Sequence, residues 1–128
     1  MDVADHLLYT KEHEWINIDG DEATIGISDY AQESLGDITF VELPGVGDEV
    51  EQFEEFASVE SVKAATDIFA PMSGEIVEVN GDLSAEPGLI NKSPYEKGWI
   101  ARVKLSDLEE QSNLMTAAEY TSFLESVG

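Results

Sequence analysis

The chain has 128 residues, which suits one domain large enough to build a hydrophobic core. It carries 28 acidic and 6 basic residues, a net charge of −22 at pH 7, which disfavours binding to nucleic acid or anionic membranes and favours basic partners. The lack of cysteine excludes disulfide bonds and thiolate metal sites.

No apolar run approaches the length of a membrane span, and the first residues lack the basic stretch of a targeting segment. We therefore expect a cytoplasmic protein of bacterial type, with a mature organellar (mitochondrial) form as the alternative. We also expect no binding to membranes.

Short strands make up most of the expected elements, and turn signals separate them. Leu7–Tyr9 opens the fold, and Asp19-Gly20 is expected to join the next two strands as a hairpin. Pro44-Gly45 and Asn80-Gly81 mark further turns. The expected strands cover residues 13–19, 22–27, 38–43, 53–62, 67–70, 75–79 and 99–105, with a turn-and-strand unit at 46–50.

Helices are expected at three places. Residues 30–35 follow Ser28 or Asp29 as a cap, with Gln32 completing a capping box after Asp29, and Gly36 is placed to end the helix. Capping boxes also begin at Ser106 and Thr116, so residues 106–127 should form a helical tail. The apolar side chains of its second helix are expected on the core; they are Tyr120, Phe123, Leu124 and Val127. Residues 86–91 and 93–95 are expected to be loop.

This pattern of many short strands and few helices predicts a mainly β fold, a sandwich or small barrel with a helical tail. No linker or low-complexity tract divides the chain, so residues 1–128 should form a single domain. Trp and Phe residues fall within strand patterns and are expected in the core.

One lysine stands apart from the other basic residues. Lys63 is the only one between Lys11 and Lys92, and strand-like runs flank it on both sides. The pattern predicts a β-hairpin with Lys63 at its tip and its ammonium in water. Such a lysine is suited to carry a long cofactor arm added by a modifying enzyme, although many exposed lysines only solvate a turn.

The residues around this lysine resemble a known family. Ala70–Asn80 resembles the strand that follows the modified lysine in lipoyl- and biotinyl-carrier domains, and Glu60-Ser61-Val62-Lys63-Ala64 resembles the H proteins of the glycine cleavage system. Further blocks with the same resemblance are His13–Trp15, Gly26–Gln32, Leu35–Ile38, Val41–Pro44, Leu89–Asn91, Pro94-Tyr95 and Gly98-Trp99.

The resemblance implies a hybrid barrel-sandwich of two antiparallel sheets with a short internal helix and C-terminal helices. It also implies that Lys63 carries covalently attached lipoate. Glu60, Ser61, Val62 and Ala64 would then form the hairpin that a lipoyl ligase or transferase recognises.

The implied function is that of a carrier, not an enzyme. Glycine decarboxylase, which uses pyridoxal phosphate, would load the aminomethyl group of glycine onto the arm. A tetrahydrofolate-dependent aminomethyltransferase would remove the methylene group, and the FAD enzyme dihydrolipoamide dehydrogenase would reoxidise the dithiol. Tethering keeps the intermediate close to several active sites. We expect this carrier to be a monomer.

A loaded arm would need shelter from water and a partner for its amine. We hypothesise that Glu14 and Asp67 line a groove for the arm and hold the ammonium through charge-assisted hydrogen bonds. The alternative is that both are ordinary solvated acids.

Other functions fit less well. A lipoyl domain of a 2-oxoacid dehydrogenase would carry Asp-Lys-Ala and a linker, and a biotin carrier would carry Met-Lys-Met. His6 and His13 lack a second ligand at metal spacing, so no metal site is expected. An unmodified acidic interaction module and an H-like protein for lipoyl relay both remain open. Some H proteins have a histidine where this chain has Ser34, so no role of that imidazole applies here.

Overall fold

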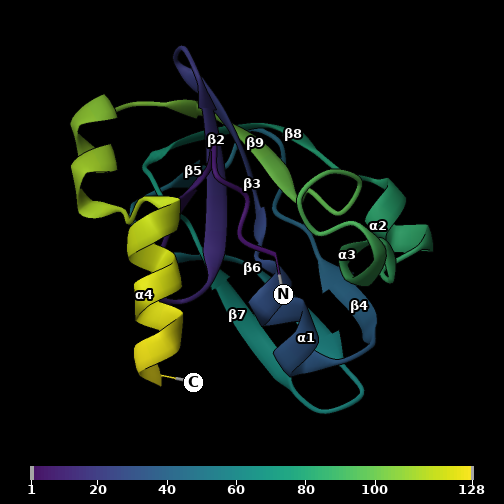
Figure 1. Cartoon of the computed structure of the whole chain (residues 1–128). Helices are drawn as coiled ribbons and strands as arrows, with labels where there is room; N and C mark the ends of the chain where they lie inside the picture. Colours follow the sequence, from purple (N-terminus) through teal and green to yellow (C-terminus); the bar gives the residue numbers. More distant parts are fainter. Residues whose placement is uncertain (1, 128) are drawn as a thin grey trace.

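A computed structural model describes residues 2–127 and shows two antiparallel sheets (Figure 1). The larger sheet has the order β1-β2-β3-β9-β8-β5, and the smaller has the order β4-β6-β7. The strands are β1 (Leu8–Tyr9), β2 (Glu14–Asp19), β3 (Glu22–Ile27), β4 (Ile38–Glu42), β5 (Glu49–Val50), β6 (Glu55–Ser61), β7 (Ala65–Phe69), β8 (Gly74–Val79) and β9 (Ala101–Leu105). The predicted mainly β sandwich is confirmed.

The two predicted tight hairpins form where expected. β2 and β3 pair from Glu14↔Ile27 to Asp19↔Glu22, so Gly20 and Asp21 make the turn. Gly20 has φ of 66°, a left-handed conformation that glycine adopts without strain. β6 and β7 pair from Glu55↔Phe69 to Glu60↔Ala65, and this hairpin projects beyond the end of the sandwich (Figure 1).

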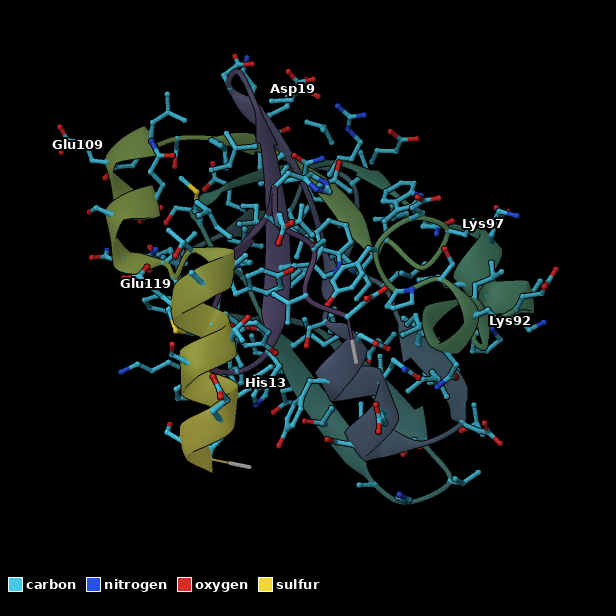
Figure 2. All side chains as sticks on the ribbon, viewed as in Figure 1. His13, Asp19, Lys92, Lys97, Glu109 and Glu119 are labelled. Atoms are coloured by element: carbon cyan, nitrogen blue, oxygen red, sulfur yellow. The ribbon has the colours of Figure 1, made fainter. Side chains whose placement is uncertain are left out.

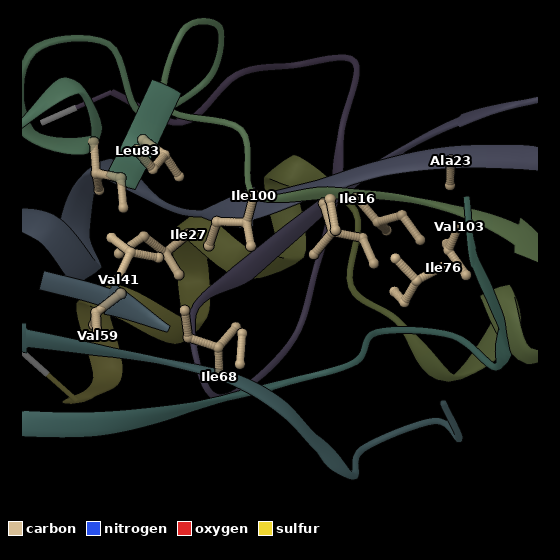
Figure 3. Packing of buried hydrophobic residues seen from close by; sticks show 14 of the residues in the cluster. Ile16, Ala23, Ile27, Val41, Val59, Ile68, Ile76, Leu83, Ile100 and Val103 are labelled. Atoms are coloured by element: carbon tan, nitrogen blue, oxygen red, sulfur yellow. The ribbon is translucent and has the colours of Figure 1, made fainter. Parts of the chain in front are cut away.

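The core lies between the sheets and is built from branched aliphatic side chains (Figure 3). Ile16 and Ile25 of the larger sheet face Val59 and Ile68 of the smaller one, and all four are at most 1% exposed. These residues alternate with outward-facing ones along each strand, as a two-sheet core requires. Ile100 completes the packing just before β9.

Helix α1 (Asp29–Leu35) lies between β3 and β4 and ends at Gly36, as expected. Its cap is Ser28, whose side chain accepts a hydrogen bond from the Ala31 amide. The predicted capping box starting at Asp29 is wrong, because Asp29 is already the first helical residue. The side-chain amide of Gln32 instead donates a hydrogen bond to the Asp29 carboxylate at 2.6 Å.

The predicted loop at residues 86–91 is partly helical, because it overlaps α3 (Leu89–Lys92), a single turn that buries Ile90. α2 (Asp82–Ala85), just before that loop, is another single turn and buries Leu83. Four residues are too few to show a helical period in the sequence, which explains the error. Asn80, predicted as a turn residue, is buried and makes three side-chain hydrogen bonds there.

The helical tail begins as a 3₁₀ helix, η1 (Leu108–Asn113), capped by Asp107 and not by Ser106 as predicted. It continues as α4 (Ala117–Val127). Thr116 and Glu119 form the predicted capping box, each accepting a hydrogen bond from the other's amide. Val127 is 54% exposed, so its expected place on the apolar face is wrong.

Helix α4 packs on the outside of the larger sheet through aromatic side chains. Tyr120 stacks on Tyr9 with ring centroids 4.3 Å apart. The Tyr120 hydroxyl lies 2.7 Å from Ser28 Oγ and 2.8 Å from His13 Nδ1, which joins α4 to the cap of α1. His13 appears beside α4 in Figure 2.

Two phenylalanines depart from the expected core. Phe40 is 51% exposed and Phe53 is 50% exposed. Both Trp15 and Tyr120 are buried, so the aromatic core is concentrated under α4. Within residues 2–127, none of the helices has the length and apolar character needed to cross a bilayer.

Candidate functional site: the lysine hairpin

The tip of the β6–β7 hairpin is a three-residue turn ordered by Ser61. The Ser61 hydroxyl accepts hydrogen bonds from the amides of Lys63 and Ala64 at 3.2 and 3.1 Å, and donates to the Ala64 carbonyl. The Ser61 amide also donates to the Ala64 carbonyl at 2.8 Å. One serine therefore fixes the backbone on both sides of Lys63, as small polar side chains do in turns.

A second set of bonds ties the tip to the loop that follows α1. The Val62 amide donates to the Asp37 carbonyl at 3.1 Å. Asn91 of α3 holds this loop from the other side: its amide donates to the Gly36 carbonyl and to Gln32, and its carbonyl accepts from the Ile38 amide. The hairpin tip is thus braced by α1, β4 and α3.

Lys63 itself is exposed, and the ion pairs within residues 2–127 involve only Arg102 among the basic residues. Its aliphatic stem runs past the end of α1. A methyl group built on Gly36 would lie 3.5 Å from Lys63 Cε and 3.5 Å from Val62 Cγ2. The geometry presents one amine in water on a fixed backbone.

Glu14, the first groove candidate, is buried at the edge of β2. Its carboxylate accepts hydrogen bonds from the Thr10 hydroxyl and from the Phe69 amide of β7, the latter at 3.1 Å. Burial raises the pKa of Glu14 to about 7, although both hydrogen bonds lower it. Glu14 therefore ties β2 to the lysine hairpin, and it is poised between its neutral and charged forms near neutral pH.

Asp67, the second candidate, is exposed on the outer face of β7, opposite Ser58. It does not share a hydrogen bond with Glu14. The side chain of Trp15, the residue after Glu14, points away from the hairpin: its indole packs over Gly26 and Tyr95 and donates to the Pro94 carbonyl at 3.0 Å.

A cavity of about 370 Å³ lies next to Glu14, at the base of the hairpin. Thr10 and Phe69, the two hydrogen-bond partners of Glu14, contribute to its wall. Its other lining residues are Tyr9, Lys11, Glu12, Phe53, Asn113 and Met115. Glu14 stands behind this wall, and Asp67 lies two residues nearer the tip than Phe69.

Several of these contributors have no sequence signal. Phe53 has φ of 67°, unusual for a large side chain, and Met115 comes from the far end of the chain by pairing with Tyr9. Asn91 acts on a loop 55 residues earlier in the sequence. Only the block Leu89–Asn91, part of the family resemblance, pointed to that region.

Known proteins are similar to this chain along nearly its whole length. The family model described as "Glycine cleavage H-protein" matches residues 7–127. The chain belongs to the glycine cleavage H-protein family. Curated relatives include the glycine cleavage system H protein of Halothermothrix orenii, 51% identical with 99% of both chains covered, and that of Vibrio campbellii, 57% identical with 93% of this chain and 95% of the relative covered.

A mitochondrial H protein of Arabidopsis thaliana is 53% identical over 96% of this chain and 79% of its own length. Among solved structures, the crystal structure of an H protein from Mycobacterium marinum has a TM-score of 0.83 and 39% identity, with 94% of this chain and 97% of that chain covered. H proteins are the lipoyl-carrier component of the glycine cleavage system and are not catalysts themselves.

Proposed function

We propose that Lys63 of this H protein carries lipoate in amide linkage. The observation that supports this most directly is the tip itself: one exposed amine, on a turn fixed by Ser61 and by the bond from Val62 to Asp37. In the attachment step an activated lipoyl donor loses its leaving group with the electron pair. The new bond joins Lys63 Nζ to the lipoyl carbonyl carbon, and the amine releases a proton.

The family's pathway supplies the proposed partners. Glycine decarboxylase loads an aminomethyl group onto the oxidised arm and releases CO₂. The aminomethyltransferase passes the methylene to tetrahydrofolate and frees ammonia, and dihydrolipoamide dehydrogenase reoxidises the dithiol with FAD and NAD. The contribution of this chain is to hold the arm at a fixed root, which raises the effective concentration at each enzyme.

The residues at the base of the hairpin fit such an arm. At about 3.3 Å per residue, β7 places Phe69 about 13 Å from Ala65, a distance comparable with the length of a lysine extended by an eight-carbon acid. The cavity beside Phe69 offers apolar walls from Phe53, Phe69 and Met115. We propose that a folded-back arm lies along β7 towards this cavity, with Asp67 beside its path and Glu14 at its end.

The attachment is tested by the intact mass of the protein from cells supplied with lipoate. We expect one lipoyl increment in the wild type and in Lys92→Ala, which removes another exposed lysine, and none in Lys63→Ala. An unmodified wild type in the presence of an active ligase would overturn the carrier proposal for this chain. An increment retained in Lys63→Ala would overturn the assignment of the site.

The groove is tested by timing hydrolysis of the aminomethyl-loaded protein. Glu14→Gln and Asp67→Ala should each shorten its lifetime several-fold, whereas Glu75→Ala, an exposed acid on β8, should leave it unchanged. Equal lifetimes for all four proteins would show that Glu14 and Asp67 do not shelter the arm.

A further inference from the structure

A β-bulge in β4 turns one large apolar side chain out of the core. Ile38 pairs with Ser61 and Phe40 with Glu60, so Thr39 is an extra residue in the strand. Ile38 and Val41 are both buried, at 5% and 4% exposed, while Phe40 between them is 51% exposed. In a regular strand Phe40 would point inward with Ile38, so the bulge is what directs it to solvent.

The exposed ring lies close to the attachment lysine. Phe40 is directly across from Glu60, three residues before Lys63. Strand spacings of about 5 Å across and 3.3 Å along the chain place the two Cα atoms roughly 11 Å apart. Val62, next to Lys63, is 66% exposed. A protein that encloses Lys63 Nζ in an active site would therefore lie close to both apolar side chains.

Acidic residues surround these two side chains. Glu42 and Glu60 flank Phe40 on the outer face of β4 and β6, and Asp37 and Asp67 lie beside the hairpin, all of them exposed. In the smaller sheet and its hairpin turn, Lys63 is the only basic residue. We call Phe40, Val62 and the carboxylates of Glu42 and Glu60 the Phe40 face.

The charge of this face selects among possible occupants. Phosphate-rich surfaces are repelled, and a second copy of the chain would bring like charges together. Enzymes that react with the far end of a lipoyl arm can meet it well away from the hairpin. The enzyme that acylates Lys63 must approach the hairpin itself, because the atom that it acylates is Lys63 Nζ, where the arm begins.

We propose that the Phe40 face is the docking surface for the lysine-acylating enzyme, and that Phe40 fills an apolar pocket on that enzyme bordered by basic residues. An exposed aromatic anchor inside a charged rim is a common arrangement for a dominant interface residue. This inference rests on the proposed function and adds to it the surface that the attachment enzyme recognises.

The test is the initial rate of lipoyl transfer from a purified lipoyl ligase to unmodified carrier, followed by intact mass at several carrier concentrations. Phe40→Ser should raise the KM for the carrier at least tenfold and leave kcat within about threefold, since the reacting atoms are untouched. The matched control is Leu108→Ser, a similarly exposed apolar residue on η1, which lies far from the hairpin (Figure 1). Its KM should equal that of the wild type.

The charged rim is tested with Glu42→Lys against Glu109→Lys, an exposed acid on η1 (Figure 2). Only Glu42→Lys should raise KM, and low salt should enlarge the difference. Unchanged KM in Phe40→Ser, or equal losses in Phe40→Ser and Leu108→Ser, would overturn the inference while the carrier proposal stands. A wild type that the ligase does not acylate at all would overturn both.

Discussion

At the scale of single residues, the hairpin depends on one hydroxyl. Ser61 Oγ makes three hydrogen bonds within the turn that holds Lys63. The place of Lys63 at an exposed hairpin tip was predictable, because strand-like runs flank it and it is the only basic residue in a long acidic stretch. The role of Ser61 could not be derived from composition, since it follows from the backbone path of a particular three-residue turn.

Ser61→Ala is expected to loosen the turn without unfolding the protein. These bonds are exposed, so water can replace the lost hydroxyl, and stability should fall by no more than about one net hydrogen bond, roughly 1 kcal/mol. Lipoylation should slow several-fold, because Lys63 is then presented in many backbone conformations. Ser61→Thr keeps the hydroxyl and should restore the rate; failure of this rescue would show that the turn bonds are unimportant for presentation.

The buried carboxyl of Glu14 predicts a pH dependence of stability. Its pKa is raised in the folded state from 4.5 to about 7, so the folded chain binds this proton more tightly than the unfolded chain. The stabilisation of the fold that comes from this proton is fully present below pH 4.5 and is lost as pH rises through 7. A change in pKa of this size corresponds to about 3 kcal/mol.

Glu14→Gln removes this titration and should flatten the dependence of the unfolding free energy between pH 4.5 and 8. Urea unfolding of both proteins across this range provides the measurement. The remaining slope in Glu14→Gln reports the other acids, so only the difference between the two curves is assigned to Glu14. Parallel curves would show that Glu14 titrates normally.

At the scale of elements, the strands were predictable and the small helices were not. Alternation in 13–27 and 99–105 is imposed by a sheet with one face on the core, so it is visible in the sequence. α2 and α3 have no period to detect, and the Phe40 bulge depends on two buried neighbours in a pairing that the sequence does not show. Of these unpredicted features, α3 and the bulge lie beside the hairpin that holds Lys63.

The chain offers a matched pair of asparagines to test how α3 braces the hairpin. Asn91 donates twice and accepts once around the loop at 36–38, and Asn80 does the same between Lys97, Trp99 and Asp82. Replacing either by alanine leaves backbone groups unpaired and should cost about 1–3 kcal/mol.

Only Asn91→Ala should speed hydrogen exchange at the Val62 amide and lower the rate of Lys63 acylation, by about threefold or more. Exchange measured by NMR, with acylation followed by mass, separates the two variants. If Asn80→Ala has the same effect at equal loss of stability, the brace through α3 plays no specific role.

At the scale of the whole molecule, charge dominates. Of the 28 acidic residues, only Glu22 and Glu78 form ion pairs within residues 2–127, both with Arg102. The large excess of unpaired carboxylates makes the folded chain repel itself. The same excess makes a negative field around the chain, and under the proposed function this field favours partners with basic surfaces.

Sodium chloride should therefore stabilise the fold. Raising ionic strength from 0.01 to 1 M shortens the screening length from about 30 to 3 Å, and we expect a gain on the order of 1–2 kcal/mol in unfolding free energy. As a control, the salt dependence of the unfolding free energy is also measured near pH 4.1, the sequence pI, where the net charge is close to zero. A salt effect of equal size at both pH values would show that screening is not its cause.

The brace around the hairpin tip has one more consequence. The groups that fix Lys63 come from Asp37 after α1, from Asn91 in α3 and from the hairpin itself. A nascent chain cannot assemble them until synthesis has passed residue 91 and the sandwich has closed. Under the proposed function, the modifying enzyme then acylates folded molecules in preference to unfolded ones. The lipoyl group therefore marks chains that have folded, and an aggregated or truncated chain stays unmodified.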